Sequence, residues 1–371
     1  MTKTLTVVQM LPELESGGVE RGTLEIGKYL VNHGHRSIVI SGGGRMVAQL
    51  KEEGSEHINW EVGKKSLLTL RYIRKVRKFL QETKPDILHL RSRLPAWIGY
   101  LAWKKLPKNQ RPHLVTTVHG RYSVSKYSEI MMRGEKIIAV SNVIRDYILD
   151  NYPQVDDDDI EVIHRGVDRD QYIYGYRPDK AWQKTWHAQF PQMQKKLLLT
   201  LPGRLTRLKG HYDFISVIDA LIQSGENVHG AIVGGVHPKK KQYVEELRQK
   251  IDDLNLGSHI TFVGERSDMR EVLAQSDVAF SLSQTPESFG RTTLEALSLG
   301  TPVLGYDHGG VREQLKAIYP NGLVEVNNVD GVVVKLQEGL PHLALPTRAH
   351  VFDVETMCSK TLSVYKELRV R

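Results

Sequence analysis

The chain has 371 residues and a mass of 42.1 kDa, enough for two domains of about 150 residues, each with its own core. Hydrophobic residues make up 40% and charged residues 25%, and no repeat or low-complexity tract is visible, which excludes disordered, fibrous and repeat proteins. The formal net charge of +8 suits nucleic acid, anionic lipid or a phosphorylated small molecule as partner, and the single cysteine, Cys358, excludes a disulfide framework and a cysteine-rich zinc site.

The first part of the chain alternates short apolar runs with helical periodicity. The N-terminal segment Met1 to Met10 lacks the apolar core of about 7 to 15 residues that a signal peptide has, and charged residues interrupt every apolar stretch approaching about 18 residues. We therefore expect a cytoplasmic protein without a membrane-spanning helix. The alternation predicts a parallel sheet with crossover helices. Its predicted strands are Leu5 to Val8, Ser37 to Ile40, Ile87 to Leu90, Leu114 to Val118 and Lys136 to Val140.

Positive charge is concentrated in this first part. Residues 1–168 hold 26 basic and 20 acidic residues, and the segment Lys64 to Lys84 carries eight basic residues against a single Glu82. Leucine, isoleucine, valine and phenylalanine between them predict an amphipathic basic helix. Two interpretations stay open: a solvated face of a core helix, or a surface for an anionic membrane or acceptor. No helix-turn-helix, zinc-finger or aromatic RNA-binding signature accompanies the charge, so we expect no nucleic acid.

A second series of strands and helices follows a polar connection, Asp168 to Gln194, that shows no clear periodicity. The sequence thus predicts two doubly wound α/β domains. The crevice between the halves is the expected ligand site, because open parallel sheets bind ligands at the carboxyl ends of their strands. The strands of the second series are Leu197 to Leu201, His229 to Val233, Ile260 to Val263, Val278 to Ser281 and Thr301 to Gly305.

The loop after the first strand of the second series reads Pro-Gly-Arg-Leu-Thr-Arg-Leu-Lys-Gly, from Pro202 to Gly210. Arg204 and Lys209 place two cations between a strand and a helix start, where backbone N–H groups also point outward. Together they can hold a diphosphate without a metal. A merely solvated basic loop is the alternative. The loop lacks the Gly-Lys-Ser/Thr ending of a P-loop, which disfavours an NTPase.

The segment Pro286 to Val303 is the most specific in the chain. Glu287 lies in a loop after an apolar strand, Gly290 permits close backbone approach, and a helix begins near Arg291 with its N-terminal dipole available to an anion. Glu295 falls in the first turns of that helix. One carboxylate before the phosphate cradle and one after it can accept hydrogen bonds from hydroxyls at opposite ends of an extended ligand, and a nucleotide sugar has that shape. A surface Glu287 and a helix-favouring Glu295 are the alternative.

Glu287 and Glu295, separated by seven residues and followed by Gly-Thr-Pro-Val, resemble the E-x7-E motif of family-4 retaining glycosyltransferases of the GT-B fold. The resemblance covers nearly the whole chain. Further matching segments follow the family's order. They are Gly17-Gly18-Val19-Glu20-Arg21, Lys84-Pro85-Asp86-Ile87-Leu88-His89, Thr117-Val118-His119-Gly120, Ala139-Val140-Ser141 and Gly203-Arg204 with Lys209-Gly210.

The resemblance implies two Rossmann-like doubly wound domains facing a central cleft, with the C-terminal helix crossing back onto the first domain. Residues 1–168 plus about 355–371 would form the acceptor-side domain, and residues 169–354 the donor-binding domain.

The resemblance also implies roles for individual residues. Glu287 would hold donor sugar hydroxyls, Glu295 the ribose, and Arg204 with Lys209 the departing diphosphate. His119 would reach the donor sugar. The catalytic set is thus Glu287, His119, Arg204 and Lys209. The expected donor-binding residues are Gly17, Gly18, Arg204, Lys209, Glu265, Arg266, Glu287, Ser288, Phe289, Gly290, Arg291, Thr292 and Glu295, with Glu265 and Arg266 near the nucleotide base.

Two positions depart from the family pattern. Arg165-Gly166-Val167-Asp168 stands where many relatives have Asn-Gly-Val-Asp, so the turn is kept but the asparagine contacts are lost. Arg291 replaces an apolar residue of many relatives. Their roles stay open. The acidic run Asp156 to Asp159 fits a solvated loop better than a metal site, and the family generally needs no metal, so we expect neither metal nor cofactor.

The resulting expectation is a retaining transferase that moves a hexosyl or N-acetylhexosaminyl group from a nucleotide-diphosphate sugar, UDP- or GDP-linked, to a hydroxyl of an envelope glycan or glycolipid such as lipopolysaccharide core. Such an enzyme would be cytoplasmic or peripheral on the inner membrane, where the segment Lys64 to Lys84 would face the anionic surface. A sugar-nucleotide epimerase of the same fold and a non-catalytic nucleotide-sugar-binding protein are the alternatives. The base, sugar, acceptor, linkage and oligomeric state do not follow from the sequence.

Overall fold

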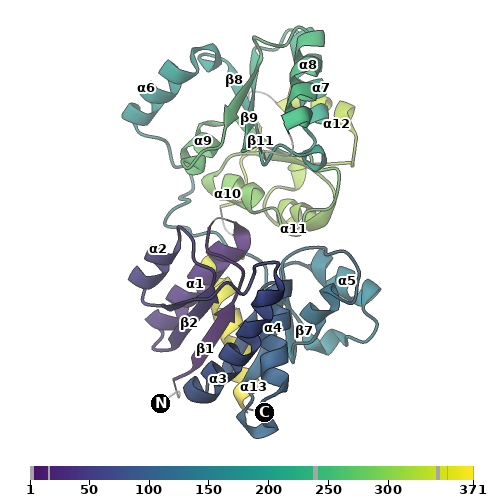
Figure 1. Cartoon of the computed structure of the whole chain (residues 1–371). Helices are drawn as coiled ribbons and strands as arrows, with labels where there is room; N and C mark the ends of the chain where they lie inside the picture. Colours follow the sequence, from purple (N-terminus) through teal and green to yellow (C-terminus); the bar gives the residue numbers. More distant parts are fainter. Residues whose placement is uncertain (1–3, 16, 237–240, 340–342, 349, 371) are drawn as a thin grey trace. The chain divides into compact units, whose positions relative to one another are not determined.

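A computed structural model of the chain describes residues 4–15, 17–236, 241–339, 343–348 and 350–370. The chain divides into two compact units, one made of residues 1–166 with 354–371 and the other of residues 167–353. Each unit is built on one parallel sheet with helices on its faces (Figure 1). The architecture is the predicted pair of Rossmann-like, doubly wound α/β domains.

The sheet of the first unit has seven parallel strands in the order β3-β2-β1-β4-β5-β6-β7. Its strands are β1 (Thr6–Met10), β2 (Arg36–Ser41), β3 (Glu56–Asn59), β4 (Ile87–Leu90), β5 (His113–Val118), β6 (Lys136–Ala139) and β7 (Ile160–Val162). Its helices are α1 (Gly18–Asn32), α2 (Val47–Glu52), α3 (Tyr72–Thr83), α4 (Arg93–Lys104), α5 (Asn142–Asn151) and α13 (Val354–Val370), with a 3-10 turn, η1 (Leu67–Arg71), before α3.

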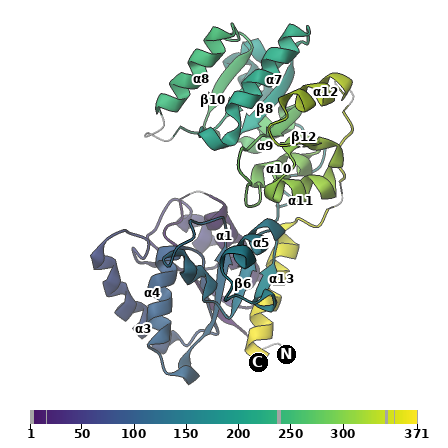
Figure 2. The same ribbon diagram turned by 90° about the vertical axis from the view of Figure 1, so that its right-hand side faces the viewer.

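Both faces of this sheet are buried, as the near-continuous apolar runs of its strands require. Val8 and Met10 of β1 pack in one core with residues of α3, α4 and α5, whereas Val7 packs on the opposite face with residues of α1 and α13. Figures 1 and 2 show α13 (yellow) lying along this unit. The last helix therefore completes the core of the first unit.

The sheet of the second unit has six parallel strands in the order β10-β9-β8-β11-β12-β13. The strands are β8 (Leu197–Pro202), β9 (Val228–Val233), β10 (Ile260–Gly264), β11 (Val278–Ser281), β12 (Val303–Tyr306) and β13 (Leu323–Val324). The helices are α6 (Lys180–Gln189), α7 (His211–Gln223), α8 (Lys241–Asp253), α9 (Met269–Gln275), α10 (Arg291–Leu299), α11 (Gly309–Ile318) and α12 (Val329–Gly339).

Two layers of helices cover the second sheet as well. Helices α7, α8 and α12 pack on one face around Phe214 and Phe280, and α9, α10 and α11 pack on the other around Leu294 and Leu315. Trp186 of helix α6 and Phe190, directly after the helix, belong to a smaller core beside β8 and β9.

The structure corrects three sequence-based predictions. The segment Lys64 to Lys84 is a 3-10 turn followed by α3 rather than a single helix. The connection predicted without regular structure contains α6, and strands β3, β7 and β13 were not predicted. Among the described helices, none combines the length and apolar character needed to cross a bilayer.

Candidate active site

The strand order of the second unit reverses direction between β8 and β11, so the loops after these two strands meet at the carboxyl edge of the sheet. The backbone N–H of Gln284 donates to the Leu208 carbonyl over 2.8 Å and ties the loops together. Gly210 adopts a φ of 73°, and a Cβ atom there would lie 1.9 Å from the Leu282 carbonyl oxygen. Only glycine therefore allows this close approach, which brings the predicted Arg204–Lys209 loop beside the Glu287 loop.

Lys209 and Glu287 form the central contact of this edge. Lys209 Nζ lies 2.7 Å from Glu287 Oε1, and Ser283 Oγ donates to the same oxygen over 2.5 Å. Burial raises the pKa of Glu287, but the charge and hydrogen bond of Lys209 and the bond from Ser283 outweigh it and leave the pKa below its ordinary value. Glu287 is therefore an ionised acceptor next to a cation at neutral pH.

The loop that carries Glu287 is held by the start of α11. Gly309 has a φ of 63°, and a Cβ there would come within 2.7 Å of the Glu287 backbone. The N–H of Gly310 donates to the Glu287 carbonyl over 2.8 Å, and Gln314 Nε2 donates to the Phe289 carbonyl. The position of the carboxylate is thus set by buried backbone contacts.

Helix α10 begins directly after Gly290, which caps it with a left-handed φ of 88°. The helix places Ser288, Phe289, Gly290, Arg291 and Thr292 at its N-terminal end. Phe289 itself is buried in the core on that face of the sheet. The N-terminal dipole of a helix favours an anion at this point.

Glu295 lies one turn into α10 and is almost buried. Its side chain is 8% exposed and pairs with Arg291, whose Nε lies 3.3 Å from Glu295 Oε1. Arg291, whose role the sequence left open, is thereby a direct partner of the second carboxylate of the motif.

Three other predicted donor residues have different surroundings. Arg204 and Glu265 are exposed. Arg266 donates to both carboxylate oxygens of Asp268 and lies over the Trp186 ring at 5.6 Å from its centroid. The structure thus places Arg266 in a contact network with α6, a surrounding that the sequence did not predict.

His119, Gly17 and Gly18 belong to the carboxyl edge of the first unit. The two glycines are exposed at the start of α1, and Gly17 adopts a φ of 145°. His119 directly follows β5, and Arg165 Nη2 lies 2.5 Å from its Nδ1.

Sequence reasoning missed Ser283, Gln314 and the buried Arg91, which donates to Gln9 Oε1 over 2.9 Å. Ser283 could have been found as a polar residue just after an apolar strand, close to the Glu287 loop. Arg91 gives the same kind of signal, because it directly follows the buried strand β4, whereas Gln314 lies inside α11 and gives none.

The acidic run Asp156 to Asp159 contains a 3-10 turn in which Asp157 pairs with Arg145 and the carbonyl of Asp158 accepts from Lys136. Within the part of the chain that the structure describes, no three His, Cys, Asp or Glu residues gather as metal ligands.

Comparisons with known proteins agree with this arrangement. Residues 16–171 match the model of Glycosyltransferase Family 4, and residues 183–340 match Glycosyl transferases group 1. A solved glycosyltransferase from Rickettsia africae ESF-5 is 29% identical, with a TM-score of 0.86 over 98% of both chains. HepE from Anabaena, solved with UDP and glucose, is 20% identical, with a TM-score of 0.80 over 98% of this chain and 100% of HepE, and shares the fold.

Among curated proteins, the alpha-maltose-1-phosphate synthase of Mycolicibacterium smegmatis is 26% identical over 253 residues, which cover 66% of this chain and 63% of the synthase. The matched segments span less than two thirds of the first curated relatives. The two family models together account for most of the chain, one on each unit. The chain therefore belongs to the glycosyltransferases of the GT-B fold, with a family-4 first domain and a group-1 second domain.

Proposed function

We propose that the protein is a retaining glycosyltransferase that moves a sugar from a nucleotide-diphosphate sugar to a hydroxyl group of an acceptor. The observation that carries the proposal is the 2.7 Å contact between Lys209 and Glu287, which the loops after β8 and β11 bring together at the carboxyl edge of the sheet. In this proposal Lys209 would hold a phosphate and Glu287 a sugar hydroxyl, and the short contact between them supports a donor whose phosphate and sugar lie next to each other.

The diphosphate leaving group would account for the positive charges at the carboxyl edge of the second sheet. Cleaving the bond between a sugar and a phosphate leaves negative charge on the diphosphate and develops positive charge on the sugar. Lys209, the exposed Arg204 and the N-terminus of α10 would stabilise the diphosphate without a metal. Glu287 would accept hydrogen bonds from sugar hydroxyls and favour the developing positive charge.

Retention of configuration requires the acceptor oxygen to bond on the face from which the diphosphate leaves. The acceptor hydroxyl forms the new bond to the anomeric carbon as the bond to the phosphate oxygen breaks, and its proton passes to a phosphate oxygen of the leaving group. Glu287 as a covalent nucleophile is less favoured, because its Oε1 already accepts bonds from Lys209 and Ser283.

The remaining donor contacts follow the E-x7-E pattern. Glu295, held by Arg291, would accept from the ribose hydroxyls. Glu265 and Arg266, at the end of β10, would lie near the base, and His119 with Gly17 and Gly18 would contribute from the first unit. HepE has been crystallised with UDP and with UDP-glucose, so UDP-glucose is the first donor to test, followed by other hexosyl and N-acetylhexosaminyl donors linked to UDP or GDP.

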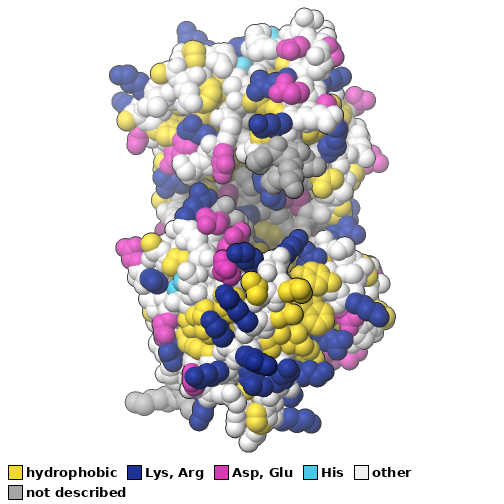
Figure 3. All heavy atoms as spheres, viewed as in Figure 1, with side chains coloured by type: hydrophobic (Ala, Val, Ile, Leu, Met, Phe, Trp, Pro, Cys, Tyr) yellow, Lys and Arg dark blue, Asp and Glu magenta, His cyan; other side chains and the backbone are white. Residues whose placement is uncertain are grey.

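The proposed acceptor is an anionic glycan or glycolipid of the bacterial envelope, such as lipopolysaccharide core, reached from the cytoplasmic side of the inner membrane. The basic segment from Lys64 to Lys84 supports this part. Lys and Arg side chains lie among hydrophobic ones on the face of the first unit that carries α3 and α4 (Figure 3). Leu67 and Leu68 of η1 are 86% and 70% exposed, a composition suited to the interface of an anionic membrane.

The test begins with thermal unfolding in the presence of UDP-, GDP-, ADP- and CMP-sugars, with and without EDTA. A donor at about 100 times its Kd should stabilise the fold by about 2.7 kcal/mol. The stabilising donor is then incubated with candidate acceptors, and nucleotide release and the anomeric configuration of the product are measured.

Stabilisation that survives EDTA, followed by acceptor-dependent release with retention, is the expected result. Conversion of the donor to an epimer without acceptor would identify an epimerase instead. Binding with no turnover toward any acceptor would favour a binding protein, and stabilisation by none of these sugars would contradict the proposed donor class.

A further inference from the structure

The imidazole of His119 has two different nitrogen environments. Arg165 Nη2 lies 2.5 Å from Nδ1, and a guanidinium group can only donate hydrogen bonds. Nδ1 must therefore be the accepting, unprotonated nitrogen, and the proton of the neutral ring resides on Nε2. Nε2 is buried and has no hydrogen-bond partner among the described residues.

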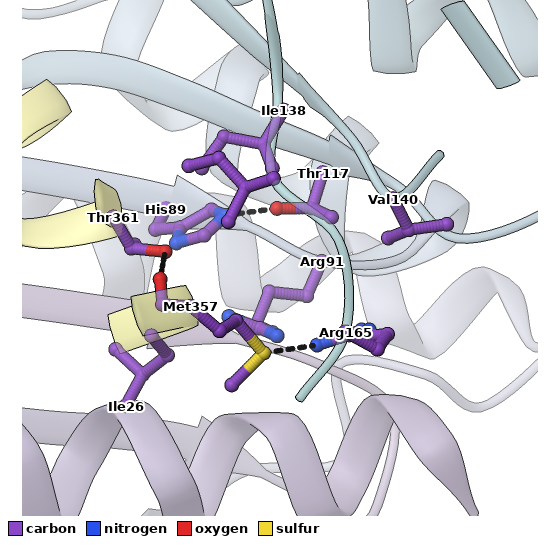
Figure 4. Close-up of a pocket in the computed structure, with 10 residues that line it drawn as sticks. Ile26, His89, Arg91, Thr117, Ile138, Val140, Arg165, Met357 and Thr361 are labelled. Atoms are coloured by element: carbon purple, nitrogen blue, oxygen red, sulfur yellow. Dashed lines mark hydrogen bonds between the residues drawn. The ribbon is translucent and has the colours of Figure 1, made fainter. Parts of the chain in front are cut away.

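Arg165 is held firmly enough to impose this arrangement. The residue is 9% exposed, and its Nη1 lies 3.9 Å from Met357 Sδ of α13. The same nitrogen packs over Gly22 of α1, where a Cβ atom would lie only 2.1 Å away. Figure 4 shows Arg165 reaching Met357 at the edge of a small cavity that Arg91 also lines. The absence of a side chain at residue 22 thus makes room for the guanidinium.

The charges around the ring keep it neutral. Burial, followed by the positive charges of Arg165 and Arg91 and by His89, lowers the pKa of His119 well below its ordinary value. Glu20 is the acidic group whose carboxyl interacts with both arginines, and burial raises its own pKa. His89 is itself fixed between Tyr365 Oη and Thr117 Oγ1, each 2.6 Å from a ring nitrogen.

We infer that Arg165 is a positioning residue that fixes His119 as the neutral tautomer protonated on Nε2 and so presents Nε2–H as a hydrogen-bond donor to a substrate oxygen. The inference rests on the proposed function for the identity of that oxygen, a hydroxyl of the transferred sugar.

Long-range proton–nitrogen spectra of protein labelled with ¹⁵N-histidine test the tautomer directly and need no substrate. The His119 signals are assigned by their loss in His119→Asn. The wild type should show only the Nε2–H form and no titration between about pH 5.5 and 8. Arg165→Met, which keeps the side-chain bulk without a donor, should populate both tautomers and allow the ring to titrate.

Gly22→Ala provides a second variant in case Arg165→Met does not fold. Its methyl group would displace Arg165 Nη1 and should give the same spectral change, whereas Gly18→Ala, where nothing lies within 4 Å of the added Cβ, should keep the wild-type His119 signals. Arg133→Met, which removes an exposed arginine paired with Glu129, is the matched arginine control.

Turnover separates positioning from a purely structural role. Arg165→Met and Gly22→Ala should each lower kcat about tenfold. Thermal stabilisation by free UDP, which lacks the sugar, should stay unchanged in both variants. The inference would be overturned if Arg165→Met and Gly22→Ala still showed only the Nε2–H tautomer of His119. It would also be overturned if both tautomers were populated and kcat did not change. Failure of the proposed function is a separate result, because it would show as absent transfer by a wild type whose spectra are as expected.

Discussion

Lys209 and Glu287 are coupled through a single short contact, so each residue sets the chemistry of the other. Glu287 Oε1 accepts from Lys209 and from Ser283, which keeps a largely enclosed carboxylate ionised. A diphosphate would compete for Lys209, and Glu287 Oε1, which keeps the bond from Ser283, could then accept from a sugar hydroxyl in place of Lys209. The pair can therefore respond to donor binding without any change in the backbone.

Removing Lys209 tests this coupling. Lys209→Ala should reduce kcat about 10²- to 10³-fold, because one preorganised charge that stabilises the leaving group is lost. Glu287→Ala should remove most turnover, because the donor sugar would lose the carboxylate that accepts hydrogen bonds from its hydroxyls. Steady-state rates with the stabilising donor, with circular dichroism to verify the fold, provide the measurement.

Arg207→Ala is the matched control for Lys209→Ala. Arg207 lies in the same short turn but pairs with Glu246 and is 60% exposed, so its loss should leave turnover near the wild-type value. Wild-type rates in both Lys209→Ala and Glu287→Ala would contradict the assignment of the site.

The sequence predicted Glu287, Arg204 and Lys209 as site residues because their loops carry residue types suited to sugar and phosphate, and the structure brings Lys209 and Glu287 into contact. The sequence did not reveal that Arg291 holds Glu295 or that Arg165 contacts His119. The second contact joins residues 46 positions apart, and only the folded sheet edge brings them together. Which side chains contact each other therefore depends on the tertiary structure rather than on the local sequence pattern.

At the scale of elements, the ten predicted strands all occur, with ends shifted by a few residues. The missed strands are short and lack an apolar run: β3 reads Glu-His-Ile-Asn and β13 has two residues. Helix α6 was missed because glutamine, lysine and histidine obscure its apolar stripe. That stripe is Trp182 and Trp186, continued by Phe190 directly after the helix, and Asp179 caps the helix by accepting from the Trp182 N–H over 2.7 Å.

The 3-10 turn η1 carries the most distinctive surface feature of the first unit. Leu67 and Leu68 are largely exposed, and Arg71 and Lys75 lie near the adjoining Tyr72 ring at 5.2 and 5.4 Å from its centroid. Two adjacent exposed leucines flanked by cations have the composition proposed above for a surface that contacts anionic lipid. An anionic lipid surface would cover the leucines and attract the cations.

The double variant Leu67→Ser/Leu68→Ser tests this membrane contact. The wild type should co-sediment with vesicles containing phosphatidylglycerol and bind pure phosphatidylcholine much less, since each basic residue near the surface contributes about 1 kcal/mol. The double variant should lose most binding, because inserting a leucine side chain contributes about 1.5 to 3 kcal/mol.

Val370→Ser is the control for that variant, because Val370 is 89% exposed on α13 of the same unit and lies outside the basic segment. It should bind vesicles as the wild type does. Equal binding to both kinds of vesicle, or none by the wild type, would contradict an anionic membrane as the partner of η1 and α3.

For the whole molecule, the division into two doubly wound units could be predicted because each has its own series of buried strands separated by amphipathic helices. The structure divides the chain after Gly166 and again before Val354, against predicted divisions after 168 and near 355. Periodicity alone could not show which sheet the last helix covers. The contact is made by Met357, Leu362 and Tyr365, which pack against strands of the first sheet.

Both units bury histidines, so stability should depend on pH in each. In the first unit, burial lowers the pKa of His89 and His119 well below the ordinary value. In the second, burial lowers the pKa of His211 and of His229 to about 4. Below the unfolded value of about 6.5, the unfolded chain binds protons that the folded chain does not, so acid favours unfolding.

The free energy of unfolding should therefore be constant above about pH 7 and fall as the pH drops from about 6.5 to 4, by about 1.4 kcal/mol per pH unit for each buried histidine. Urea unfolding followed by circular dichroism at several pH values measures the slope. His211→Gln combined with His229→Gln should flatten the slope for the second unit, because the folded and unfolded states then differ by two fewer protons. A slope unchanged by the double variant, or a wild type equally stable at pH 7.5 and 4.5, would show that these rings are protonated in the folded protein.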